Sequence, residues 1–104
     1  GARATDAWRR DHVELPFGGT RAMILNFGPA ATTAYVYLQA DDSKFKEVAL
    51  SYAVGDRKAT LRDASYPFEF TVPIPVGAAT FDFEVVGVTL SGEKHSSGAA
   101  VLQR

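Results

Sequence analysis

The chain has 104 residues, of which 46% are hydrophobic and 22% are charged, and its formal net charge is −1. These values are typical of one soluble globular domain and argue against a disordered chain, a fibrous repeat or a membrane protein, while the dispersed Lys and Arg residues make nucleic acid an unexpected partner. Cysteine is absent, which excludes disulfides and zinc–thiolate sites, and the apolar runs are far shorter than the roughly 20 residues of a membrane-spanning helix.

The chain begins with small and polar residues, from Gly1 to Thr5, which show no apolar period. We therefore interpret residues 1–7 as a linker or cloning remnant and predict a single domain over residues 8–104. Such a start suggests a module cut from a longer protein.

Short runs in which apolar and polar residues alternate follow one another along the chain, separated by Gly, Pro and Asp. In the first run Val13, Leu15 and Phe17 share one face, and Pro16 marks an edge strand because proline cannot donate a ladder hydrogen bond. Further along, Gly55-Asp56 predicts a tight hairpin turn. The runs predict strands over residues 11–17, 21–27, 32–40, 45–54, 58–62, 66–72, 80–89 and 97–103.

The number and spacing of these runs indicate the fold class. About seven short strands, with turn signals about every 8–12 residues, favour an all-β, immunoglobulin-like Greek-key sandwich of antiparallel strands over a small barrel. No stretch of ten or more residues shows the apolar period of a helix, so any helix is predicted to be a single turn.

Five features between Val48 and Val101 occur in a fixed order. They are a strand with a Gly-Asp hairpin (47–56), an aromatic strand (66–71), a Pro-Val-Gly corner (75–77), a second aromatic strand (80–85) and a Ser-Gly turn (91–92). In this order they resemble the bacterial immunoglobulin-like, or Big-type, modules found in strings within secreted enzymes, adhesins and envelope proteins. The resemblance implies an extracytoplasmic location (secreted, periplasmic or cell surface), a modular context and no shared catalytic residues.

Histidine is the main candidate for acid–base chemistry, and the sequence has two, His12 and His95. We expect His12 on an edge strand and His95 in a loop, with no nucleophile-elbow motif to accompany either. We therefore predict no catalytic residues, no enzyme activity of this chain and no cofactor. Two distant histidines also fail the ligand spacing of a zinc or copper site.

A calcium site is the one metal site that the sequence suggests. Asp41 and Asp42 lie in a predicted turn, which other sandwich loops can approach with a carboxylate such as Asp63 or Glu93. Calcium prefers about six to eight oxygen ligands, far more than this pair supplies. A solvated acidic turn is therefore the preferred interpretation, with calcium as the alternative.

Tyr35 and Tyr37 are two residues apart and point to the same face of their predicted strand. If Ala34, Val36 and Leu38 fill the core, the two rings lie on the solvent side. There they could stack on sugar rings, together with Trp8 and Gln39. The alternative is that both tyrosines pair across the sheet with long neighbours such as Glu69 and Thr71.

Val86, Val88 and Leu90 form an apolar row on the strand over residues 80–89 and its continuation. If Phe81, Phe83 and Val85 point inward, this row points outward beside Ala49, Ser51 and Ala53, and forms an uncharged interface with a partner. The alternative is a β-bulge at Gly87 that turns Val86 and Val88 into the core.

These patterns predict a non-catalytic accessory module that acts as a spacer, packing partner or adhesive unit of a larger extracytoplasmic bacterial protein. The expected partners are adjoining domains of the same polypeptide or another protein. Two alternatives stay open, namely a carbohydrate-binding module that uses the tyrosine pair to bind polysaccharide, and a self-associating structural subunit that uses the Val86–Leu90 face.

Overall fold

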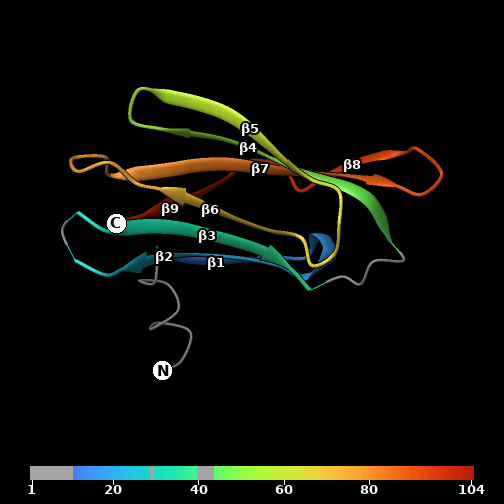
Figure 1. The fold of residues 1–104 in the computed structure, drawn as a ribbon, viewed down its shortest axis with the longest axis horizontal. Helices are drawn as coiled ribbons and strands as arrows, with labels where there is room; N and C mark the ends of the chain where they lie inside the picture. The colour runs from blue at the N-terminus through green and yellow to red at the C-terminus, as the bar shows by residue number, and fades with distance from the viewer. Residues whose placement is uncertain (1–10, 29, 40–43) are drawn as a thin grey trace.

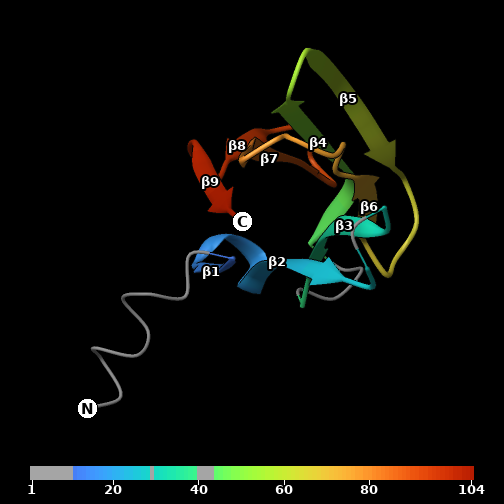
Figure 2. The same cartoon turned by 90° about the vertical axis from the view of Figure 1, so that its left-hand side faces the viewer.

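The computed structural model describes residues 11–28, 30–39 and 44–104. They form two antiparallel β-sheets packed face to face (Figures 1 and 2), which confirms the predicted all-β, immunoglobulin-like sandwich. Sheet A has the strand order β1-β2-β3-β6, and sheet B has the order β5-β4-β7, with β8 and β9 both paired to the free edge of β7. The strands are β1 (His12–Leu15), β2 (Thr20–Asn26), β3 (Thr32–Leu38), β4 (Phe45–Val54), β5 (Arg57–Asp63), β6 (Glu69–Pro73), β7 (Thr80–Thr89), β8 (Lys94–Ser96) and β9 (Ala100–Gln103), and η1 (Phe17–Gly19) is a 3₁₀ turn.

The alternation seen in the sequence sorts the side chains between the core and the two outer faces. On β3, for example, Ala34, Val36 and Leu38 are buried, while the residues between them are half-buried on the outer side. Because successive side chains of a strand point to opposite faces, each sheet contributes one apolar layer to a shared core. The core contains Ala22, Ala34, Val36, Leu38, Phe45, Val48, Leu50, Val54, Phe68, Phe70, Val72, Ile74, Phe81, Phe83, Val85 and Leu102.

Four predicted strands differ from the observed ones by two residues or more, including those predicted over residues 32–40 and 66–72, since β3 ends at Leu38 and β6 begins at Glu69. The first ends at Leu15 because Pro16 is the N-cap of η1, which follows directly. The last begins at Ala100 and not at residue 97, and an unpredicted strand, β8, lies before it; Gly98, with a φ of 79° that glycine adopts readily, lies between the two. The described residues therefore form nine strands, and His95 lies on β8 rather than in a loop, which corrects the prediction for that residue.

The connections gather at the two ends of the sandwich. One end, which we call the loop end, carries the β2–β3 turn, the β4–β5 turn at Gly55-Asp56 and the β6–β7 loop over residues 74–79 (left in Figure 1). β9 ends on this side, as Gln103 pairs with Thr80, whereas β1 begins level with the middle of β2, where His12 pairs with Met23. The opposite end carries η1, the β5–β6 connection and the β7–β8 turn.

Within the ranges that the structure describes, no helix has the length and apolar character needed to span a membrane.

Candidate functional site

The tyrosine pair lies on the outer face of sheet A. Tyr35 and Tyr37 are both half-buried, and their rings stack with centroids 5.2 Å apart and an interplanar angle of 30°. Each ring therefore turns one face toward the other, which leaves one face of each ring for any further contact. A flat two-ring platform would need the rings side by side, so this geometry favours mutual stacking.

The Tyr35 hydroxyl donates a hydrogen bond of 2.8 Å to Oε2 of Glu69, a residue of β6. The β3–β6 register places Tyr35 opposite Thr71 and Tyr37 opposite Glu69, so this bond runs diagonally across the strand pair. It raises the pKa of the Tyr35 phenol above its ordinary value of 10.0, with burial and the negative charge of Glu69 as further causes. Tyr35 thus makes the cross-strand contact with Glu69 that the alternative interpretation of the tyrosines expects, while Tyr37 stacks on Tyr35.

Replacing Glu69 by Gln is expected to lower the pKa of Tyr35, because the amide oxygen can still accept the hydrogen bond but lacks the negative charge that disfavours the tyrosinate. The raised pKa means that stability from this bond is fully present below pH 10.0 and is lost as the pH rises through the higher folded-state pKa. Tyrosinate absorbance against pH measures the change, with Tyr35→Phe identifying the Tyr35 signal. Glu14→Gln, the same change two strands away, should leave the Tyr35 pKa alone, and an equal effect of both substitutions would contradict the assignment.

The remaining members of the predicted sugar-binding set are not brought to the tyrosine pair by the described structure. Trp8 lies outside the described residues. Gln39 follows the end of β3 and is exposed, and its side chain lies against Gly19, where an added Cβ would come within 3.2 Å of the Gln39 Cβ. Sugar binding by these four residues stays a prediction.

The predicted apolar row divides between sheet B and the turn after it. Val86 and Val88 are half-buried on the outer face of β7, and Gly87 between them is buried. The β4–β7 register runs without a break from Val54 opposite Phe81 to Glu47 opposite Val88, so the β-bulge predicted as an alternative at Gly87 is wrong. The one irregularity lies on β4, between Phe45 and Glu47. Leu90 lies beyond the strand in the β7–β8 turn and is 65% exposed.

Because β4 lies between β5 and β7 in sheet B, Ala49 and Ala53 form the floor of a shallow channel on its outer face. Each residue on the outer face of β4 has one partner on β5 and one on β7: Ala53 lies between Lys58 and Asp82, and Ser51 lies between Thr60 and Glu84. A hollow of about 520 Å³ lies over this part of the face. We call the surface the sheet B trough, with the floor Ala49, Ser51 and Ala53, the β5 wall Lys58, Thr60 and Arg62, and the β7 wall Asp82, Glu84 and Val86.

Sequence reasoning missed the walls of the trough. The alternation of Lys58, Thr60 and Arg62 was visible as a strand, but which strands lie on either side of β4 depends on pairing between distant segments. The local signal therefore indicated an uncharged face, whereas the structure shows an uncharged floor between two charged walls.

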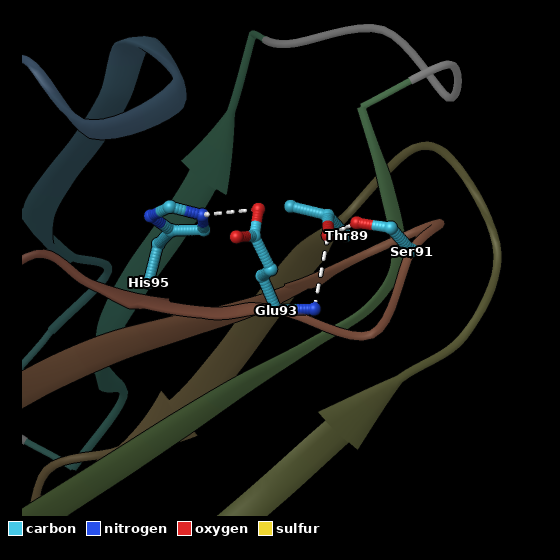
Figure 3. Close-up of polar contacts among 4 residues, drawn as sticks. All are labelled: Thr89, Ser91, Glu93 and His95. Carbon is cyan, nitrogen blue, oxygen red and sulfur yellow. Dashed lines mark hydrogen bonds and ion pairs between the residues drawn. The ribbon is translucent and has the colours of Figure 1, made fainter.

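The β7–β8 turn gathers the polar residues drawn in Figure 3. The Thr89 hydroxyl accepts a 3.1 Å hydrogen bond from the Glu93 amide and lies 3.0 Å from the Ser91 hydroxyl, while the Glu93 carboxylate lies 3.7 Å from Nε2 of His95. Glu93 stands between His95 and Ser91 in this view, so the histidine faces a carboxylate and not a hydroxyl. These contacts close an exposed turn. His12, the other histidine, lies on β1 in the opposite sheet.

The calcium candidates Asp41 and Asp42 lie outside the described residues. Asp63, a further acidic residue considered with them, accepts hydrogen bonds of 3.2 Å from the amides of Ser65 and Glu69 and so organises the β5–β6 connection. In the ranges 11–28, 30–39 and 44–104, no three His, Asp or Glu side chains come together as ligands of one metal ion. Calcium binding stays a prediction for the aspartate pair.

Comparison of the chain with models of protein families, with curated proteins and with solved structures gave no match. The likeness to bacterial immunoglobulin-like modules therefore rests on the order of sequence features, and the sandwich fold is what the structure establishes.

Proposed function

We propose that this chain is a non-catalytic immunoglobulin-like accessory module of a larger extracytoplasmic bacterial protein, and that it packs against an adjoining domain through its loop end. The sandwich fold and the resemblance described above support the module and its location. The observation that carries the proposal is the exposure of two large apolar side chains at the same end of the sandwich.

These side chains are Phe27, which is 73% exposed beside the β2–β3 turn, and Val76, which is 76% exposed in the β6–β7 loop. A hollow of about 740 Å³ lies beside Val76, between the β6–β7 loop and the β4–β5 turn at Gly55-Asp56. Exposed apolar groups next to a concave surface are typical of an interaction site. Burying each side chain would contribute about 1.5–3 kcal/mol to an interface.

The loop that carries Val76 is held to the end of the chain. The Arg104 amide donates a 3.0 Å hydrogen bond to the Ala79 carbonyl, and its guanidinium donates to the carbonyls of Pro75 and Ala78 at 3.4 and 3.3 Å. The Ala78 amide also donates to the Pro75 carbonyl at 3.1 Å. The loop is therefore presented as a fixed shape, which lowers the entropic cost of binding.

The last strand of the chain ends at the same end of the sandwich as the exposed apolar side chains. β9 ends at the loop end, where Gln103 pairs with Thr80, the first residue of β7. A domain joined after Arg104 therefore starts beside the β6–β7 loop that carries Val76, to which Arg104 is hydrogen-bonded. A short connection makes such a contact effectively intramolecular, so even a modest apolar interface is occupied.

The test compares this chain with a longer version that carries the segments encoded on either side. Amide hydrogen exchange in the β6–β7 loop is expected to slow at least about tenfold in the longer protein, because docking suppresses local opening. The combined change Phe27→Ser and Val76→Ser should remove this protection. Leu90→Ser is the matched control, since Leu90 is 65% exposed at the opposite end.

The control should keep the full protection of the longer protein. Equal exchange rates in the short and long chains would refute docking at the loop end, as would protection that survives the Phe27 and Val76 substitutions.

A further inference from the structure

Charge is distributed unevenly across the sheet B trough. The β5 wall carries Lys58 and Arg62, and the β7 wall carries Asp82 and Glu84. Lys58, Arg62 and Asp82 are exposed, while Glu84 is half-buried and accepts a hydrogen bond from the Ser96 hydroxyl. One side of the trough is therefore basic and the other is acidic.

The small floor keeps these two walls apart. Because neighbouring strands lie about 4.8 Å from each other, the backbones of β5 and β7 are separated by about 10 Å, with β4 between them. The ion pairs within the described ranges are Arg21–Glu14 on sheet A and His95–Glu93 at the β7–β8 turn. Neither joins the two walls, so their charges are available to a partner.

A partner that fits this surface must carry the reverse order of charges, acidic over β5 and basic over β7. A second copy of this chain has that order when it is turned about a two-fold axis that runs along β4. This rotation places β5 of one copy over β7 of the other. Each row of laterally paired residues, such as Lys58, Ala53 and Asp82, keeps its height along the strands. Lys58 then faces Asp82 of the second copy, Asp82 faces Lys58 of the second copy, and Thr60 faces Glu84.

We propose that the sheet B trough is a self-association surface, and that two copies pack face to face about this axis. The contact is isologous, because the same residues contribute from both copies. It adjoins the loop end, because Lys58 also lines the hollow beside Val76, but Phe27 and Val76 themselves are not part of it.

The charges also exclude the other simple arrangement. A two-fold axis perpendicular to β4 would place β5 over β5 and bring Lys58 over Arg62 of the second copy. Like charges facing each other in an interface oppose association strongly. The axis along β4 instead pairs Lys58 with Asp82 twice, once on each side, and places Glu84 against Thr60 and Arg62 against Val86, so no like charges meet.

The floor contributes through the long side chains that cross it. The aliphatic stem of Lys58 can lie beside Ala53 of the facing copy while its charged end meets Asp82, and the stem of Arg62 can lie over Ala49 and Val86. The stems thereby cover the two alanines of the floor, which no other part of the described chain covers in the monomer. Val86 extends the same apolar surface at the Arg62 row.

Sedimentation equilibrium of this chain over a range of concentrations tests the proposal. The expected result is a reversible dimer that weakens as salt is added, because its contacts are exposed ion pairs. Lys58→Asp and Asp82→Lys should each reduce the association constant at least about tenfold, since each puts like charges in contact. The double variant with both changes should restore association, because it only exchanges the two walls.

Lys44→Asp is the control, since it makes the same charge change at an exposed residue before β4, outside the trough. It should leave the association constant unchanged. A monomer at every concentration would overturn the proposal, and so would a dimer that both single substitutions leave intact. A dimer weakened by each substitution but not restored by the double variant would overturn the two-fold arrangement, because the charges would then meet different partners.

Discussion

Replacing Phe81 by alanine is expected to lower the free energy of unfolding by about 3–5 kcal/mol, the range typical of a buried phenylalanine truncated to alanine. Domains of this size are stable by about 5–15 kcal/mol, so the variant should lose a large part of its stability. Urea denaturation followed by circular dichroism measures the change. The midpoint should fall while the slope stays close to that of the parent chain.

The size of this effect follows from the place of Phe81 in the core. Its side chain is 0% exposed, and its ring packs against Tyr52 and Phe83 with centroids 5.5 and 5.6 Å away. In sheet B it lies between Val54 of β4 and Leu102 of β9, so three strands hold its backbone. These strands cannot move together to fill the space that the ring leaves, and the cavity therefore persists.

Phe27→Ala is the matched control, because it removes the same atoms from a side chain that is 73% exposed. We expect a change of at most about 0.5 kcal/mol in the isolated chain, as for most surface substitutions. Similar losses for the two variants would show that Phe81 does not occupy the packed centre of the sandwich.

The fold could be predicted because each strand shows its alternating pattern in residues that are adjacent in the sequence. The period of two sorted Ala34, Val36 and Leu38 to the core, and the same period sorted Tyr35 and Tyr37 to the outer face. The β4–β5 hairpin at Gly55-Asp56 also follows from neighbouring residues. The strand β8 was not predicted, because Lys94, His95 and Ser96 are polar and show no apolar alternation.

The candidate sites were less accessible to sequence reasoning, because they depend on which strands become neighbours. The bond between Tyr35 and Glu69 joins residues 34 positions apart. The sheet B trough forms only when β5, β4 and β7 lie side by side. No pattern of neighbouring residues predicts that Lys58 and Asp82 lie on either side of Ala53. The residues of each site were visible as a face of one strand, but their partners across the sheet were not.

Gly87 illustrates how packing decides a position that the local pattern left open. The alternation of β7 continues through this residue, so its hydrogen side chain points into the core and Val86 and Val88 point outward. A Cβ added to Gly87 would lie 2.5 Å from Cε1 of Phe45 and 2.7 Å from its Cδ1. The glycine is therefore required by the close approach of a ring, and no bulge is needed to explain it.

We expect Gly87→Ala to lower the free energy of unfolding by about 1–3 kcal/mol, the usual cost of overpacking a core. The sign is informative, because alanine in place of an unstrained glycine otherwise stabilises a protein by about 0.4–1 kcal/mol through the unfolded state. The Phe45 ring cannot easily retreat, since it stacks on Phe17 at 5.4 Å and meets Phe68 edge-on at 6.4 Å. Thermal and urea unfolding measure the change.

A double-mutant cycle assigns the clash to one contact. Phe45→Leu removes the ring atoms that an alanine at position 87 would meet, so the double variant should be at least about 1 kcal/mol more stable than the sum of the single changes predicts. Phe27→Leu makes the same chemical change on the exposed surface, and its effect should simply add to that of Gly87→Ala. Additivity in both cycles would mean that the methyl group at position 87 is accommodated elsewhere, and that Phe45 is not what excludes a side chain from the middle of β7.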